Sequence, residues 1–141
     1  MYLHHLNLLA VLVAAVSTMV VGLIWYSPVL FARPWVREMG WDPDDKAKMQ
    51  QMQKSAGPAY LGSFVASLIS AFVLALVFHW MRVGSVHAGL GAAFHVWLGF
   101  VATVQFTGAL FQKQSRKLFA INTGYQLVCY LAMGAILAAW T

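Results

Sequence analysis

Charged side chains are scarce in this chain. Only 9% of the 141 residues are charged, whereas 61% are hydrophobic. Soluble domains carry about 25% charged residues, so the composition excludes an ordinary soluble domain with a solvated surface. Charge is absent from four stretches: 1–32, 55–81, 83–112 and 118–141. Because the first of these lacks the basic start of a signal peptide, we expect it to be a retained helix.

Each charge-free stretch is long enough to cross a membrane. About 20 apolar residues in a helix span the hydrocarbon core of a bilayer. We therefore predict an all-α fold, an integral membrane bundle of four transmembrane helices, with residues 1–141 as a single domain. The expected helices cover about 6–26, 59–81, 86–111 and 118–140.

Acidic residues and cysteine are the scarcest of the chemically useful side chains. The single cysteine, Cys129, excludes an intrachain disulfide and a cysteine-only metal site. No carboxylate lies in a charge-free stretch, which excludes a carboxylate proton relay or a paired-carboxylate active site within the membrane. A phosphate-binding glycine loop and a His-Glu-x-x-His motif are also absent. These absences favour a protein that is not an enzyme.

The basic residues lie in the connections between the expected helices. Five of the nine Lys and Arg lie in residues 33–54, one is Arg82, and three lie in residues 113–117. This distribution is typical of topogenic charge, so the net charge of +5 does not indicate a nucleic-acid partner. Cytoplasmic loops carry the excess of Lys and Arg. We therefore predict a multi-pass protein of the cell (inner) membrane, with the 33–54 connection cytoplasmic and both termini outside the cytoplasm.

Aromatic residues mark the end of the first expected helix. Trp25 and Tyr26 close the apolar stretch, and Trp35 follows shortly after the first charged residue. Such amphipathic rings are enriched where a membrane meets water, so we expect these three at headgroup level. Pro28 is expected to end the helix, since the residue before a proline is biased away from helical geometry.

The 33–54 connection predicts one short amphipathic segment. Asp42 suits an N-cap and Pro43 suits the first helical position after it. The resulting helix would place Met49, Met52 and Ala56 on one face, which we expect to rest on the membrane surface.

Two stripes of small residues at a spacing of four predict close helix contacts. The first lies in helix 6–26 and the second in helix 59–81. Their members are Ala10, Ala14, Thr18 and Gly22, and then Ala59, Ser63, Ser67, Ala71 and Ala75. Because these stripes exceed what one tight crossing needs, they favour a homo-oligomer.

Four polar residues lie at membrane depth in the last two helices. His95 lies about 13 Å into its helix, near the middle of a hydrocarbon layer about 30 Å thick. Gln105 is about 80° from His95 on a helical wheel, so both are expected to face the protein, either within one bundle or at a subunit interface. In an antiparallel hairpin Gln105 would bond to Asn122 or Gln126, and His95 would lie level with Gly134. These four polar residues either line a solute path or bond the helices together.

The remaining histidines fall near the outer interface under this orientation. They are His4, His5, His79 and His87. Imidazole ligands suit zinc, copper and iron, so these residues are weak candidates for a metal site. No cofactor is favoured by the sequence.

Short motifs along the whole chain resemble a known family. They are Trp25-Tyr26-Ser27-Pro28, the Phe31 to Trp35 spacing, Trp97-Leu98-Gly99-Phe100, Asn122-x-Gly124-Tyr125, and Met133-Gly134-Ala135-Ile136-Leu137. In their order they resemble the small bacterial membrane proteins grouped as domain of unknown function 1761. The resemblance implies a four-helix integral membrane protein of bacterial origin, with no assigned activity and no catalytic residues to carry over.

Three functions stay open at this point. The first is a channel or transporter for a small solute or ion. The second is a structural or accessory membrane protein of a larger complex, in contact with the lipid bilayer. The third is a histidine-dependent metal or redox protein.

Overall fold

A computed structural model describes residues 7–27 and 29–140, and every regular element in that part of the chain is a helix. Four helices are long and apolar enough to cross a membrane, with α5, η2 and α6 forming one of them. This confirms the predicted all-α fold with four such helices. The elements are α1 (Leu8–Trp25), α2 (Ala32–Glu38), α3 (Lys46–Ser55), α4 (Gly57–Met81), α5 (Val86–Val96), the π-helix η2 (Trp97–Ala102), α6 (Thr103–Phe111) and α7 (Arg116–Trp140).

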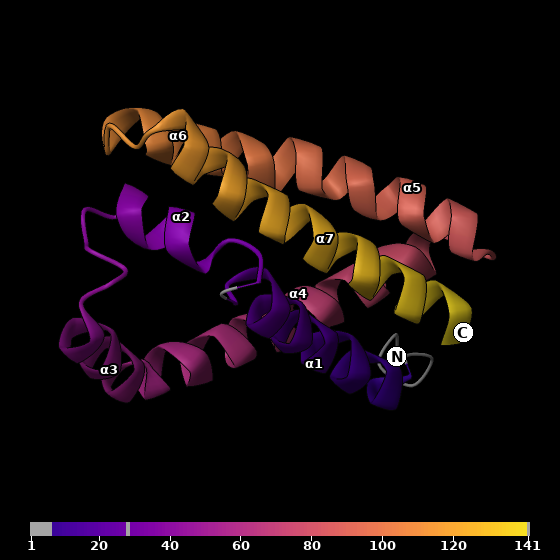
Figure 1. Cartoon of the computed structure of the whole chain (residues 1–141). Coiled ribbons are helices and arrows are strands. Elements are labelled where there is room, and N and C mark those ends of the chain that lie inside the picture. The colour runs from indigo at the N-terminus through magenta and orange to yellow at the C-terminus, as the bar shows by residue number, and fades with distance from the viewer. Residues whose placement is uncertain (1–6, 28, 141) are drawn as a thin grey trace.

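Helix α7 is the central element of the bundle. It packs against α1 on one side and against α5 on the other, while α1 also packs against α4. The start of α1 and the end of α7 lie at the same end of the molecule, and α2 lies near the α6–α7 turn at the other end (Figure 1). The short helices α2 and α3 therefore both belong to the end away from the termini.

The hydrophobic core is built largely from small side chains of α1, α4 and α7. Ala10, Ala14 and Ala15 of α1 are completely buried, and Thr18 is nearly so. Met133 and Leu137 of α7 are also buried and belong to the same core cluster. The first stripe of small residues is therefore a helix contact, as predicted, because small side chains let two helices approach closely.

The second stripe is a contact over only part of its length. Ala71 and Ala75 are buried, and Ser67 bonds to α1, but Ala59 and Ser63 are exposed. Helix α4 crosses α1 at an angle, so its first half runs past the crossing toward α3 (Figure 1). The regular spacing of four thus correctly predicts the contact face but not where the contact ends.

Helices α5 and α7 approach most closely at two glycines. A Cβ on Gly89 would lie 2.5 Å from the Cβ of Ala138, and a Cβ on Gly134 would lie 2.7 Å from the Cβ of Ala93. The expected place for the His95 ring opposite Gly134 is therefore wrong. The space beside Gly134 is filled by the backbone and small side chains of α5.

The connection before α4 differs from its prediction in two ways. Helix α3 is capped by Asp45, whose carboxylate accepts a hydrogen bond from Lys48 N at 3.1 Å, so the expected cap at Asp42 is wrong. Asp42 instead accepts a hydrogen bond from Asp44 N at 2.9 Å, which holds a turn ahead of the helix. Helix α2 was not predicted at all.

One face of α3 and the C-terminal end of α1 agree with the prediction. Met49, Met52 and Ala56 are half-buried, while the rest of α3 is exposed. Helix α1 ends at Trp25 with Tyr26 as its cap. The predicted role of Pro28, and the expected helix start at residue 6, lie outside the described residues.

Candidate functional site

Polar and aromatic side chains at the end of α1 bind α7. Tyr26 Oη donates a hydrogen bond to Asn122 Oδ1 at 2.8 Å, and Trp25 Nε1 donates to the Ile121 carbonyl at 3.0 Å. The Trp35 ring packs edge-on against Tyr26, with centroids 5.6 Å apart. Gly124 leaves room for the Trp25 ring, because a Cβ there would lie 3.2 Å from it. The three aromatic residues therefore join helices, and their headgroup-level position stays a prediction.

A second polar cluster joins α1, α4 and α7 around Thr18. The Thr18 hydroxyl lies 2.7 Å from the Ala15 carbonyl and 2.8 Å from the Ser67 hydroxyl, so it can donate to the first and accept from the second. Tyr125 Oη donates to the Thr18 carbonyl at 3.3 Å, and Cys129 Sγ lies 4.0 Å from the same oxygen. Thr18 thus holds three helices together through buried polar contacts.

The expected bond between Gln105 and α7 is not formed. Within the described residues, Gln105 Oε1 is buried without a hydrogen-bond partner, and so is Thr123 Oγ1. The Asn122 oxygen is already occupied by Tyr26. The same membrane-length span forms a hydrogen bond to α7 through Trp97, whose Nε1 donates to the Thr123 carbonyl at 3.1 Å.

His95 lies on the outer surface of the single chain and not inside its bundle, so the predicted position at a subunit interface stays a prediction. Its side chain is exposed, and Nδ1 lies 2.7 Å from the Gly91 carbonyl of its own helix. The π-helix η2 stands between His95 and Gln105. A π-turn holds about one residue more than an α-turn, which is about 100° of rotation. The expected separation of about 80° therefore becomes about 180°, and the two residues lie on opposite faces.

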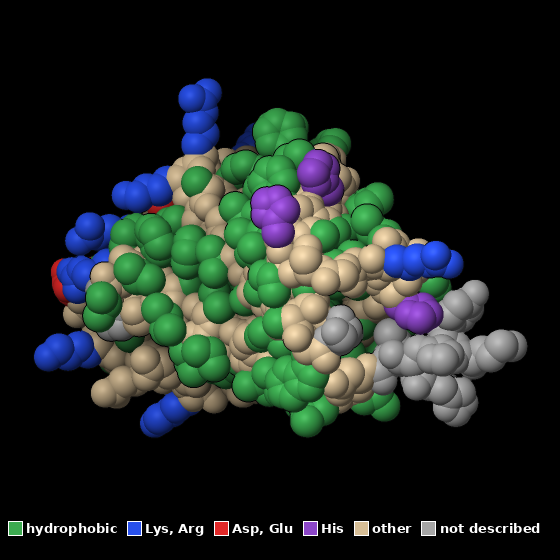
Figure 2. Space-filling view, turned by 90° about the vertical axis from the view of Figure 1, so that its right-hand side faces the viewer, with side chains coloured by type: hydrophobic (Ala, Val, Ile, Leu, Met, Phe, Trp, Pro, Cys, Tyr) green, Lys and Arg blue, Asp and Glu red, His purple; other side chains and the backbone are tan. Residues whose placement is uncertain are grey.

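The other histidines do not gather into a ligand set in the described part of the chain. His79 and His87 are exposed, and histidines lie among hydrophobic side chains on the face seen in Figure 2. No group of three or more His, Cys, Asp or Glu that could hold a metal occurs among the described residues. His4 and His5 lie outside them.

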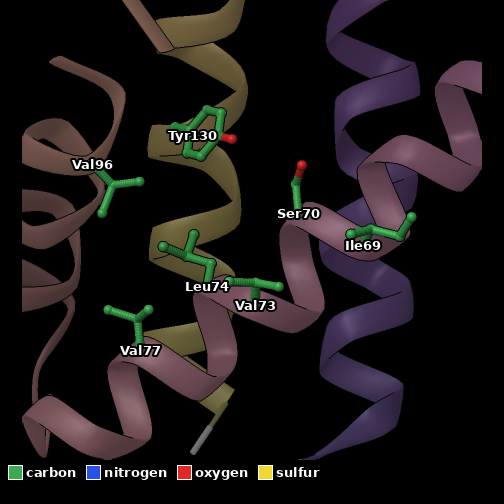
Figure 3. A pocket seen from close by; sticks show the side chains of 7 residues that line it. All are labelled: Ile69, Ser70, Val73, Leu74, Val77, Val96 and Tyr130. Carbon is green, nitrogen blue, oxygen red and sulfur yellow. The ribbon is translucent and has the colours of Figure 1, made fainter. Parts of the chain in front are cut away.

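An apolar groove opens between α4, α5 and α7. Its volume is about 260 Å³, and its walls are five residues of α4 between Ile69 and Val77, with Val96 of α5 and Tyr130 of α7 (Figure 3). Ser70 and Tyr130 supply the hydroxyl groups on its wall, and the other lining side chains are aliphatic. None of the four predicted solute-path residues lines this groove.

Comparison with known families places the fold in context. The family described as "Protein of unknown function (DUF1761)" matches residues 9–138, from the start of α1 to the end of α7. The chain belongs to the DUF1761 family. The match confirms the resemblance noted in the sequence and adds no activity to it. Comparisons of this DUF1761 protein with curated proteins and with solved structures gave no match.

Sequence reasoning missed the residues that join the helices of this DUF1761 protein. Thr18 and Ser67 belong to the small-residue stripes, and the spacing of the stripes gives no sign that the two hydroxyl groups are hydrogen-bond partners. Trp97 offers a clearer signal, because it lies in the middle of an apolar helix and indoles usually lie at the membrane interface. A tryptophan at that depth needs a hydrogen-bond acceptor from a neighbouring helix.

Proposed function

We propose that this DUF1761 protein is a multi-pass membrane protein of the structural or accessory class. In this proposal its helices form a dry, hydrogen-bonded bundle that presents apolar faces to lipid and to a larger complex. The observation that carries it is the use of the polar groups inside the bundle. Thr18, Ser67 and Tyr125 bond across three helices, and Asn122 accepts from Tyr26.

A channel or transporter for a small solute or ion is the second candidate. It is favoured by the buried oxygens Gln105 Oε1 and Thr123 Oγ1, which have no protein partner among the described residues and can accept a hydrogen bond from a solute or water. The described groove supports it less, because its walls are mostly aliphatic. Polar groups that line a path must also be freed from their helix partners, and Asn122 is bound to Tyr26.

Flux through proteoliposomes separates the two candidates. We expect liposomes that contain the protein to release entrapped ions and small polar solutes no faster than protein-free liposomes. Gln105→Leu, which removes the unpaired oxygen, should leave that rate unchanged. A flux that Gln105→Leu abolishes and Gln53→Leu, on the exposed surface of α3, preserves would replace the accessory function by a path along α6 and α7.

The proposed orientation places both termini outside the cytoplasm. It is supported by the distribution of Lys and Arg, eight of which lie in the two connections at the α2 end, whereas Arg82 lies in the α4–α5 turn. The start of α1 and the end of α7 share one end of the molecule (Figure 1). Cytoplasmic connections carry the positive excess, so the α2 end faces the cytoplasm in this proposal.

A homo-oligomer is proposed from the position of His95. The residue lies mid-way along the Val86–Phe111 span and is exposed in the single chain. Ionisable side chains at membrane depth almost always face protein or water, so a second copy covering this face would shield the imidazole. We expect His95→Trp to reduce the size of the detergent-extracted particle while Trp80→His, at the end of α4, does not. An unchanged particle size in the first variant would contradict an interface at this face.

A further inference from the structure

The end of the molecule that holds α2 and the α6–α7 turn carries exposed cations from two connections. Ser115 Oγ donates a hydrogen bond to Glu38 Oε2 at 2.5 Å, which joins these connections although they are distant in sequence. Four basic residues lie within two positions of this bonded pair, and all four are exposed. We call them the basic end: Arg37, Lys113, Arg116 and Lys117.

The acidic residues nearby do not neutralise the basic end. Asp44 forms an ion pair with Arg33, with 2.8 Å between Oδ1 and the guanidinium nitrogen. Asp42, Asp45 and Glu38 keep their negative charges, because their hydrogen bonds come from neutral donors. Glu38 is the one carboxylate within two positions of the bonded pair, so the four cations of the basic end outnumber it. No ion pair is formed between the basic end and a carboxylate of the described residues. Its charge is therefore available to an external anion.

The basic end lies directly against the apolar part of the bundle. Val36, beside Arg37, and Leu118, beside Lys117, are both buried, with 7% and 5% of their surfaces exposed. Arg116 and Lys117 also begin α7, whose N-terminus adds positive potential at that end. Cations at the end of a membrane-length helix lie at the level where lipid phosphates are found.

We propose that the basic end binds the headgroups of anionic phospholipids. Phosphate supplies the matching charge, and a guanidinium can bond two phosphate oxygens at once, while the lysines add point charge. A lipid is the occupant that fits, because its chains can lie beside the exposed apolar side chains next to the basic end, Leu110 and Phe111 at the end of α6. The proposal rests on the membrane insertion proposed above, but on neither the orientation nor the accessory function.

The test is lipid binding by the full chain purified in a neutral detergent. Dioctanoyl phosphatidylglycerol and dioctanoyl phosphatidylcholine are titrated separately, and binding is read by native mass spectrometry. We expect the anionic lipid to bind more tightly in 50 mM salt and to lose most of that advantage in 500 mM salt, where surface charges are screened. Removing one cation of the basic end should weaken binding of phosphatidylglycerol about fivefold, since each Lys or Arg near an anionic surface contributes about fivefold to the affinity.

Charge-matched variants localise the binding. Arg116→Gln and Lys117→Gln should each weaken binding of phosphatidylglycerol about fivefold and leave phosphatidylcholine unaffected. Arg82→Gln removes the same charge at the opposite end of the molecule and should leave both affinities unchanged. Melting temperatures of the three variants should match the parent, because these side chains are exposed.

Three outcomes would overturn the proposal. Equal affinities for the two lipids would remove the role of the headgroup charge. If Arg82→Gln weakened phosphatidylglycerol binding as much as Arg116→Gln does, the effect would come from the net charge of the protein and not from the basic end. Displacement of phosphatidylglycerol by the same concentration of inorganic phosphate or of a short DNA duplex would assign the surface to a soluble anion instead.

Discussion

Most buried polar side chains in this protein follow one physical rule, and Gln105 Oε1 and Thr123 Oγ1 are exceptions among the described residues. A hydroxyl, amide or indole inside an apolar bundle must find a hydrogen-bond partner within the protein, because hydrocarbon offers none. Tyr26 finds Asn122, Thr18 finds Ser67, and Trp97 finds a carbonyl of α7. His95 has no neighbouring helix in the single chain and bonds the carbonyl of Gly91 in its own helix. The neighbours available at each depth decide which polar groups join helices.

Tyr26→Phe tests the bond at the end of α1. The change removes the hydroxyl that donates to Asn122 and leaves Oδ1 unpaired. Interhelical hydrogen bonds of this kind contribute about 0.6–2 kcal/mol, so we expect the free energy of unfolding to fall by that amount and the melting temperature in detergent to fall with it. Tyr60→Phe is the matched control, since Tyr60 is 55% exposed. Equal melting temperatures in both variants would show that the bond does not stabilise the bundle.

The Arg33–Asp44 pair gives a prediction on protonation. The hydrogen bond from Arg33, together with its charge, holds the pKa of Asp44 below its ordinary value, and Arg37 adds a smaller effect. A carboxyl with a depressed pKa stabilises the folded chain above the ordinary aspartate pKa of about 3.9. That contribution is lost as the pH falls through the lower pKa of the folded state.

Carbon-detected NMR of the Asp44 carboxyl checks this prediction. We expect Arg33→Gln to raise the pKa of Asp44 toward its ordinary value, and Arg37→Gln to raise it less. If both variants raised the pKa of Asp44 equally, or if neither raised it, the Arg33–Asp44 pair would not be the cause of the lowered pKa.

At the scale of whole elements, backbone details set which faces meet. The π-helix η2 turns the second half of its span, so α5 and α6 present different faces from those of a continuous α-helix. At the α5–α7 crossing, Gly89 and Gly134 place backbone against backbone. Because glycine has no side chain, these two residues determine how closely α5 and α7 approach each other.

Gly134→Ala tests this crossing. The added Cβ would lie 2.7 Å from the Cβ of Ala93 and 3.0 Å from the Gly89 carbonyl, so the helices must move apart. Overpacking of this kind costs about 1–3 kcal/mol, and we expect a lower thermal midpoint. Gly62→Ala has open space around its Cβ and should be neutral or stabilising, because alanine favours a helix over glycine by about 1 kcal/mol. A midpoint unchanged by Gly134→Ala would mean that α5 and α7 are less tightly packed.

At the scale of the whole molecule, charge and hydropathy have separate consequences. Four apolar helices leave large hydrophobic side chains exposed along the bundle, such as Leu23, Leu61 and Phe100. That surface matches a lipid environment. The basic residues gather at the α2 end, and this asymmetry is the basis for the proposed orientation.

Reporter fusions test the orientation directly. A fusion at Thr141 should report a location outside the cytoplasm, and one inserted at Met49 should report the cytoplasm. Replacing Arg116 and Lys117 with Gln weakens the positive excess and should increase the fraction of inverted molecules. A cytoplasmic signal at Thr141 in the parent protein would reverse the assignment.

The sequence alone determined the number of long helices, their approximate limits and the distribution of charge. These features follow from local properties, because twenty apolar residues in a row form a membrane-length helix whatever they touch. The small-residue stripe of α1 belongs here as well, since its spacing defines one face of a helix. The family motifs were also readable, and the match over residues 9–138 confirms them.

The tertiary structure alone decided which polar groups became partners. Wheel positions placed Gln105 and His95 on one face, but a π-turn between them, which no residue pattern revealed, separated them. The amide expected to bond Gln105 was taken by Tyr26 from a different helix. Partnership depends on the depth, rotation and crossing angle of helices distant in sequence. Those quantities arise from the packing of the entire bundle, so no single stretch of residues contains them.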